Sequence, residues 1–195
     1  MTSRESEIIS LIKKEVKPAL GCTEPIAVAL AVAKAAEVMQ DGVSAYGWRR
    51  QQGYKLVIEV SGNILKNGMG VGIPGTGMVG LHIAAALGAV CGKSSYGLEV
   101  LHDLDEGSVA VAKKLVESES IALSLAETDL KLYVKVSVEY LGHVSYAVIQ
   151  KDHDNIVETA FDGVVKNIDS KVSAEVALEQ KTTLDYGLTI KEILD

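Results

Sequence analysis

Cys22 is the residue in this chain with the clearest chemical potential. It lies in the segment Gly21-Cys22-Thr23-Glu24-Pro25, directly before a predicted helix in which Thr23 is the expected N-cap. The dipole and free N–H groups at a helix N-terminus stabilise a thiolate, so this position favours a lowered thiol pKa. The alternative is a small buried cysteine at a tight turn, which residue composition by itself favours.

A glycine-rich stretch over residues 61–80 is the second place where chemistry is expected. Glycines let the backbone approach a small anion, and the helix predicted after this stretch offers N–H donors to a carboxylate or phosphate. Polar contacts could come from Asn63, Lys66, Asn67 and the segment Gly75-Thr76-Gly77. The alternative is a structural loop whose glycines serve turns and packing. A G-x-G-x-x-G match inside the stretch contains Pro74 and follows no strand directly, so a dinucleotide site is not indicated.

The remaining polar candidates give weaker signals. His153 lies in a polar loop and could orient a substrate or transfer a proton, although an exposed loop histidine is an equally good interpretation. The chain has two cysteines, Cys22 and Cys91, and neither belongs to a C-x-x-C pair. Iron–sulfur clusters usually require four protein thiolates. We therefore expect no metal site formed by this chain alone.

The elements that must position these residues follow from hydrophobic spacing. Helical spacing predicts helices over 6–16, 26–39, 81–90 and 107–117, with Asp41-Gly42 ending the second. Alternation predicts strands over 54–60, 98–101, 121–126, 132–141, 144–150 and 155–159, with a hairpin turn at Gly142-His143. This order indicates an α+β fold of small-residue helices packed with an antiparallel or mixed sheet, with the Gly-rich loop before the second long helix.

Three segments are predicted along the chain. Residues 1–96 contain the GCTEP motif and the Gly-rich loop, and residues 97–169 form an α+β lobe. Residues 170–195 have the pattern of a helical connector. The small-residue helices are compatible with a homodimer.

Composition excludes several classes of partner. The net charge is −7 and the pI is about 5.2, which argues against nucleic acid and against anionic membrane surfaces. The N-terminal residues resemble a charged amphipathic helix rather than a secretory signal, and no apolar run is long enough to span a bilayer. A soluble cytoplasmic protein is expected.

Two long strings resemble a known enzyme family. EVKPALGCTEPIAVALA and LKNGMGVGIPGTGMVGLHIAAALGA are similar to segments of the iron–sulfur L-cysteine desulfidases, which are related to the L-serine dehydratase alpha chain. The shorter strings YGLEVL and HDNIVET fit the same pattern, so the resemblance covers about residues 10–165. Members of that family convert L-cysteine to pyruvate, ammonia and sulfide, or act similarly on serine. They use a [4Fe–4S] cluster and no pyridoxal phosphate.

The resemblance implies roles for individual residues. Cys22 matches the thiol expected to act as the catalytic base, or as a transient neighbour of the cluster. The bound amino acid would be held by Thr23, Glu24, Asn63, Lys66, Asn67, Gly75, Thr76, Gly77, His153 and Asn155. The family is considerably longer, and its cluster cysteines lie in a C-terminal half that this chain lacks. The expectation is therefore a substrate-binding part that is inactive alone, and the alternative is a non-catalytic amino-acid-binding or regulatory module.

Overall fold

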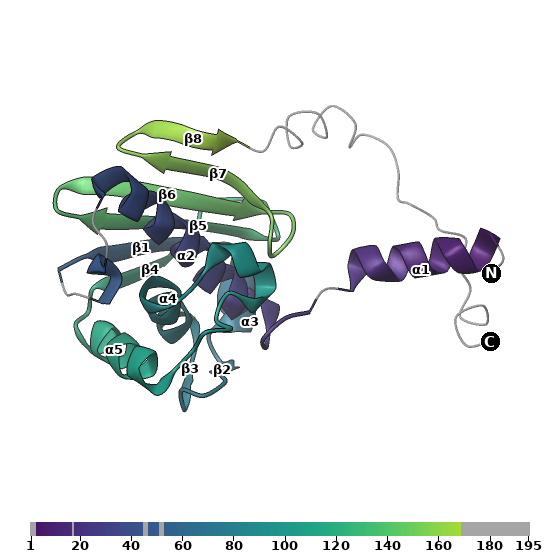
Figure 1. Ribbon diagram of the computed structural model, residues 1–195, viewed down its shortest axis with the longest axis horizontal. Coiled ribbons are helices and arrows are strands. Elements are labelled where there is room, and N and C mark those ends of the chain that lie inside the picture. Colours follow the sequence, from purple (N-terminus) through teal and green to yellow (C-terminus); the bar gives the residue numbers. More distant parts are fainter. Residues whose placement is uncertain (1–2, 17, 45–46, 51–52, 169–195) are drawn as a thin grey trace.

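The computed structural model describes residues 3–16, 18–44, 47–50 and 53–168. The α-helices within these ranges are α1 (Ser3–Glu15), α2 (Thr23–Val43), α3 (Gly62–Gly68), α4 (Leu81–Val90) and α5 (Glu106–Glu117). Short 3₁₀ helices cover Trp48–Arg50 and Ser94–Glu99. The strands are β1 (Lys55–Val60), β2 (Gly72–Ile73), β3 (Met78–Val79), β4 (Ile121–Leu125), β5 (Tyr133–Tyr140), β6 (His143–Gln150), β7 (Ile156–Phe161) and β8 (Val164–Ile168). In Figure 1, α2 and α4 lie against the large sheet and α1 stands apart from it.

The large sheet is mixed, which confirms the predicted α+β fold class. Its strand order is β4-β1-β5-β6-β7-β8. The β1–β4 pair is parallel, and the other neighbours are antiparallel. A parallel pair needs a long crossover, which here contains α3, α4 and α5, whereas β5 to β8 are joined by short turns. The turn between β5 and β6 is Leu141-Gly142, and both residues have positive φ, one position earlier than predicted.

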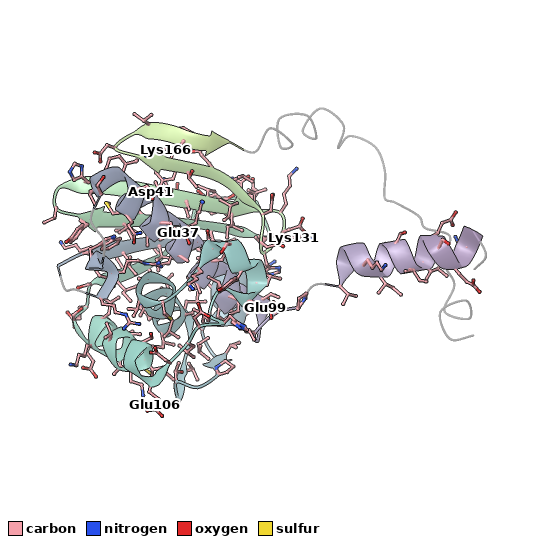
Figure 2. The ribbon with its side chains drawn as sticks, viewed as in Figure 1. Glu37, Asp41, Glu99, Glu106, Lys131 and Lys166 are labelled. Atoms are coloured by element: carbon pink, nitrogen blue, oxygen red, sulfur yellow. The ribbon has the colours of Figure 1, made fainter. Side chains whose placement is uncertain are left out.

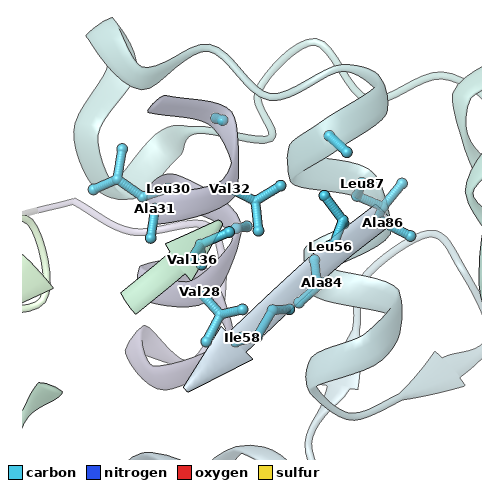
Figure 3. Packing of buried hydrophobic residues seen from close by; sticks show 14 of the residues in the cluster. Val28, Leu30, Ala31, Val32, Leu56, Ile58, Ala84, Ala86, Leu87 and Val136 are labelled. Carbon is cyan, nitrogen blue, oxygen red and sulfur yellow. The ribbon is translucent and has the colours of Figure 1, made fainter. Parts of the chain in front are cut away.

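One face of the sheet carries the core. In β1, the side chains of Leu56, Ile58 and Val60 are fully buried, while those of Lys55 and Val57 on the opposite face are not. The same alternation occurs in β5, because successive side chains of a strand point to opposite faces. The buried face is covered by α2 and α4, whose side chains are mostly Ala, Val and Leu. Figure 3 shows β1 residues beneath side chains of both helices.

Small residues allow α2 and α4 to approach closely. A Cβ atom built on Gly88 of α4 would lie 2.4 Å from the carbonyl oxygen of Ala29 in α2. Just beyond α4, Arg49 donates to the carbonyl oxygens of Gly88, Ala89 and Gly92 at 2.7–2.8 Å. This guanidinium satisfies carbonyls at the helix C-terminus and places a positive charge where the helix dipole favours one.

The 3₁₀ helix Ser94–Glu99 is anchored to α2. Glu37 of α2, labelled in Figure 2, accepts hydrogen bonds from the backbone N–H and the hydroxyl of Ser94. The prediction of a strand over 98–101 is wrong, because this segment completes the 3₁₀ helix and a turn. Leu98, Val100 and Leu101 are buried, and a short apolar run does not distinguish a strand from another buried segment by its spacing.

Helix α2 continues past its predicted end at Asp41-Gly42 and reaches Val43. A Cβ on Gly42 would lie 2.2 Å from the ring of Phe161 in β7. Gly42 is thus a point of close approach between helix and sheet, and it does not terminate the helix. The left-handed residue that follows the helix is Ser44, with φ 52°.

The Gly-rich stretch is more ordered than the predicted loop. It contains α3 and the small β2–β3 hairpin before α4 begins at Leu81. A Cβ on Gly68 would lie 2.4 Å from the side chain of Leu81, so this glycine allows α3 to pack against the start of α4. The prediction of a helix over 81–90 is confirmed.

The structure bears on the three predicted segments to different extents. Strand β1, from the predicted 1–96 segment, lies between β4 and β5 of the 97–169 segment, so both contribute to one sheet. The division into folding units stays a prediction. The helical connector predicted over 170–195 lies outside the described residues. Among the described residues, no helix combines the length and the apolar character needed to cross a membrane.

Candidate functional site

Cys22, Glu24 and Asn67 form a hydrogen-bonded group that joins α2 to α3. The thiol of Cys22 donates to Glu24 Oε2 at 2.8 Å. The side-chain amide of Asn67 donates to the other oxygen, Glu24 Oε1, at 3.2 Å. The hydroxyl of Thr23 is 3.5 Å from Glu24 Oε2. Asn67, 43 positions from Glu24 in the sequence, therefore shares the Glu24 carboxylate with Cys22.

Local structure explains why these side chains meet. Cys22, rather than Thr23, is the N-cap of α2, with extended backbone angles (φ −67°, ψ 136°). Glu24 then falls in the first helical turn, where a negative charge is favourable. Helix α3 follows β1 directly, with Ser61 as its N-cap. The Ser61 hydroxyl donates to the carbonyl of Lys131 at 2.9 Å, which ties the start of α3 to the segment that leads into β5.

The electrostatics of the pair favour a thiol and a carboxylate. The hydrogen bond to Glu24, followed by partial burial, raises the pKa of the Cys22 thiol. The same hydrogen bond is the main cause that lowers the pKa of Glu24, and Asn67 and the charge of His153 add to it. The expectation of a lowered Cys22 pKa is therefore wrong. The helix N-terminus does favour an anion, but the Glu24 carboxylate beside Cys22 opposes a second negative charge.

One exposed face of α3 presents polar groups beside this pair. Asn63, Lys66 and Asn67 are spaced i, i+3 and i+4, so they lie on the same side of the helix. All three are exposed. Because Asn67 bonds Glu24, this face of α3 borders the start of α2. The hydrogen-bonded group thus combines a thiol, a carboxylate and an amide, and Lys66 lies on the same side of α3 as Asn67.

Two predicted site residues, His153 and Asn155, lie in the β6–β7 turn, and they differ in their relation to Glu24. His153 is partly buried, and its charge acts on the Glu24 carboxylate. The side chain of Asn155 instead donates to the carbonyl of Gln150 at 3.0 Å, a bond within the turn itself. The structure thus gives His153 only a minor influence on the pKa of Glu24, and Asn155 shapes the turn that carries His153.

The Gly75-Thr76-Gly77 segment forms the tip of the β2–β3 hairpin. Both glycines have positive φ, and Thr76 is buried, with 3% of its surface exposed. Its hydroxyl donates to the carbonyl of Ile73 at 2.7 Å and accepts from the backbone N–H of Met78 at 3.0 Å. These bonds hold the turn together, so the structure gives Thr76 a structural role and does not bring it to the thiol–carboxylate group.

An apolar groove that the sequence did not indicate adjoins the GCTEP motif. It has a volume of about 540 Å³ and is lined by Ala19, Leu20, Gly21, Ile73, Pro74, Gly75, Leu101 and Leu104. Three segments far apart in sequence form it, which is why periodicity could not reveal it. The one residue that stood out locally in the sequence of this groove was Pro74. Its ring would contact a Cβ atom placed on Gly21.

The residues present do not fit an iron–sulfur cluster. Cys22 is exposed at the start of α2, and Cys91 is half-buried at the end of α4. Within the described part of the chain, no group of three or more His, Cys, Asp or Glu side chains is arranged to hold a metal ion. Two thiolates are fewer than such clusters usually take, so a cluster would need ligands from outside this chain.

Comparisons with known proteins give relatives named UPF0597 protein. A UPF0597 protein of Bacteroides fragilis is 45% identical over 194 residues, which is 99% of this chain and 42% of the relative. A UPF0597 protein of Phocaeicola vulgatus is 49% identical over 160 residues, covering 82% of this chain and 35% of the relative. One of Porphyromonas gingivalis is 38% identical over 200 residues, with 96% and 44% covered. No family model matches the chain, and no solved structure matches it significantly.

These relatives correct the resemblance drawn from the motifs. The proteins that match nearly the whole chain are not named as iron–sulfur L-cysteine desulfidases, so the assignment of this chain to that family is wrong. The name UPF0597 denotes an uncharacterised family and states no activity. The chain is similar to UPF0597 proteins over most or all of its own length, and it spans less than half of the length of the relatives it matches.

Proposed function

We propose that this chain is the substrate-binding and proton-transfer part of a lyase that acts on a small amino acid with a β-substituent, such as L-cysteine or L-serine. The observation that carries the proposal is the Cys22–Glu24–Asn67 group at the surface, with Lys66 on the adjoining helical face. A thiol paired with a carboxylate is suited to proton transfer, since one group can hold the proton that the other gives up.

The proposed role of Cys22 is that of the base. As a thiolate, it takes the α-proton of the bound amino acid, and the electron pair left on the α-carbon expels the β-substituent as sulfide or hydroxide. The resulting enamine becomes an imine, and water hydrolyses the imine to pyruvate and ammonia. Lys66 and Asn63 hold the substrate carboxylate. Activation of the leaving group, including any metal cluster that assists it, belongs to the part of the longer relatives that this chain does not match.

The test uses both this chain and a protein of the relatives' full length. Calorimetry should detect L-serine binding to the isolated chain, with weaker binding to Lys66→Ala, while no pyruvate is formed. The full-length protein should form pyruvate from L-cysteine or L-serine. Replacing the residue equivalent to Cys22 by alanine should abolish pyruvate formation and retain serine binding.

One result would overturn the lyase assignment, namely a full-length protein that makes no pyruvate from either amino acid under anaerobic conditions, which protect any cluster. An alanine variant at Cys22 that keeps full activity would overturn the role of Cys22 as the base. An isolated chain that turns over by itself would show that the proposed dependence on further residues is wrong.

A non-catalytic amino-acid-binding module is the second candidate. It is favoured by the raised pKa of Cys22, because a thiol held in its protonated form is a poor base until something releases it. In that case L-serine binds the chain with the same affinity before and after Cys22→Ala, and no full-length relative shows turnover.

A further inference from the structure

Helix α1 carries apolar side chains that the described part of the chain leaves exposed. Ile12 is 52% exposed and Val16 is 69% exposed. Both lie on one side of the helix, because residues four apart share a face, and the N–H of Val16 still donates to the carbonyl of Ile12 at 2.8 Å. Figure 1 shows α1 projecting from the body. A helix of 13 residues is marginal in water by itself, so this stripe indicates a contact with another surface.

The apolar groove beside the GCTEP motif begins four residues after this stripe. Leu20 lines the groove, is itself 38% exposed, and is anchored by the hydrogen bond from its N–H to the carbonyl of Leu98 at 3.3 Å. Pro74 and Leu104 lie among the lining residues that come from later segments. Aliphatic side chains that enter such a groove leave water, which favours docking.

Charges beside the two apolar surfaces are opposite in sign. Residues 11–17 contain three lysines and one glutamate, whereas residues 99–106 contain four acidic residues and no lysine or arginine. The second range includes two leucines that line the groove. Lys93 and Arg50 pair with Asp103 and Asp105, which offsets part of the acidic charge and leaves an excess. The end of α1 and the groove therefore complement each other in charge as well as in apolar character.

The fold keeps α1 away from the groove of its own chain (Figure 1). Val16 still bonds to Ile12, and Leu20 bonds to Leu98. A reversal of α1 onto its own groove would therefore have to be completed within residues 17–19. Pro18, whose ring restricts the backbone, lies in that short segment. A second copy can present its α1 to the groove without any such reversal.

We propose that α1 of one copy of this chain docks in the groove of a second copy, and that the exchange is reciprocal. Ile12 and Val16 enter the groove, and the lysines at the end of α1 face the acidic residues of 99–106. Each copy supplies one helix and one groove, so a two-fold symmetric dimer makes the same contact twice. The inference concerns assembly and does not depend on the proposed function.

Analytical ultracentrifugation of the chain at micromolar concentration tests the docking of α1. The parent should sediment as a dimer of the 20.7 kDa chain. Ile12→Asp should weaken the dimer by about tenfold or more, because it places an unpaired charge in an apolar contact. Ser10→Asp is the matched control. It adds the same charge on the opposite side of α1, since two residues span just over half a helical turn, and it should leave the dimer unchanged.

The groove is tested in the same way. Pro74→Asp should weaken the dimer to a similar extent, because Pro74 lines the groove. Val79→Asp is its control, since Val79 lies in the same hairpin, is 62% exposed and does not line the groove. Circular dichroism confirms that each variant is folded, and Leu20→Asp takes the place of Pro74→Asp if the latter does not fold.

A mixture of the two damaging variants tests whether the exchange is reciprocal. In a mixed dimer, the intact α1 of the Pro74→Asp chain meets the intact groove of the Ile12→Asp chain. One of the two contacts is then restored, whereas neither variant alone can form an undamaged contact. The equimolar mixture should therefore dimerise more tightly than either variant by itself.

Three results would overturn the inference. A parent chain that remains monomeric excludes the exchange and leaves the apolar surface to the further residues of the longer relatives. A dimer that Ile12→Asp weakens and Pro74→Asp does not would be held by α1 against another surface, so the groove is not its site. A mixture that dimerises no better than its components shows that the helix of one copy does not enter the groove of the other.

Discussion

Glu24 accepts hydrogen bonds on both carboxylate oxygens, and its negative charge strengthens both bonds. At the scale of single residues, the site is therefore a balance of charges rather than one reactive thiol. Cys22 supplies the proton, Glu24 the charge that retains it, and Asn67 the constraint on the geometry. Loss of the Glu24 charge should change both the reactivity of the thiol and the stability of the fold.

We expect the contribution of Glu24 to stability to depend on pH in one direction. The folded-state pKa of Glu24 lies below its ordinary value of 4.5, so the unfolded chain binds the proton more readily. The stabilisation is present above pH 4.5 and is lost as the pH falls through the lower folded pKa. Urea unfolding over a pH series should show the difference between the wild type and Glu24→Gln shrinking as the solution is acidified. A difference that stays constant with pH would contradict this assignment.

At the scale of elements, glycines set how closely helices and strands approach. Gly88 lets α4 lie against the backbone of α2, Gly42 accommodates the ring of Phe161, and Gly68 accommodates Leu81. None of the three has positive φ, so the missing side chain matters here and the conformational freedom of glycine does not. The buried sides of α2 and α4 consist largely of alanine and valine for the same reason.

Gly88→Ala should therefore destabilise the protein. Its methyl group would lie 2.4 Å from the carbonyl oxygen of Ala29, and overpacking against backbone costs about 1–3 kcal/mol. Gly62→Ala is the matched control. Its Cβ would meet only Leu125 at 3.9 Å, and because Gly62 is the first residue of α3 and exposed, the change should alter stability by about 0.5 kcal/mol or less. The free energy of unfolding in urea measures both, and equal effects would show that the helix contact is not tight.

At the scale of the whole molecule, the described elements cover one face of the sheet and leave the other face open (Figure 1). The helices α2 and α4 bury the face that carries Leu56, Ile58 and Val60. The groups of the candidate site lie where the start of α2 meets the end of α3. The core thus fixes the relative positions of α2 and α3, and their positions fix the distance from Cys22 to Asn67. A substitution in the core should therefore alter the geometry of the candidate site.

Adjacent residues of β1 test this two-layer arrangement. Leu56 is fully buried beneath the helices, so Leu56→Ala should cost about 2–5 kcal/mol. Val57 lies on the opposite face and is partly exposed, so Val57→Ala should cost about 1 kcal/mol or less. Urea unfolding curves of the two variants give the comparison. Similar losses for both would mean that the open face is covered as thoroughly as the other.

Local sequence patterns were sufficient for most of the elements. The spacing of apolar residues predicted α2, α4, α5 and strands β1 and β4 to β7, because periods of 3.6 and 2 are properties of short segments. The same patterns identified Cys22 at a helix start, and Asn63, Lys66 and Asn67 as polar neighbours in the Gly-rich stretch. These residues form part of the candidate site in the structure.

Only the tertiary structure decided which of these residues act together. The parallel pairing of β1 with β4, the place of Gly42 under Phe161 and the bond between Asn67 and Glu24 join residues far apart in the chain. Such contacts depend on how the layers pack, which no local period encodes. The pKa of Cys22 is a different case, because the contact that changes it is local. The helix N-terminus predicted a lowered pKa, whereas the side chain of Glu24, two positions further along the chain, accepts a hydrogen bond from the thiol and raises its pKa.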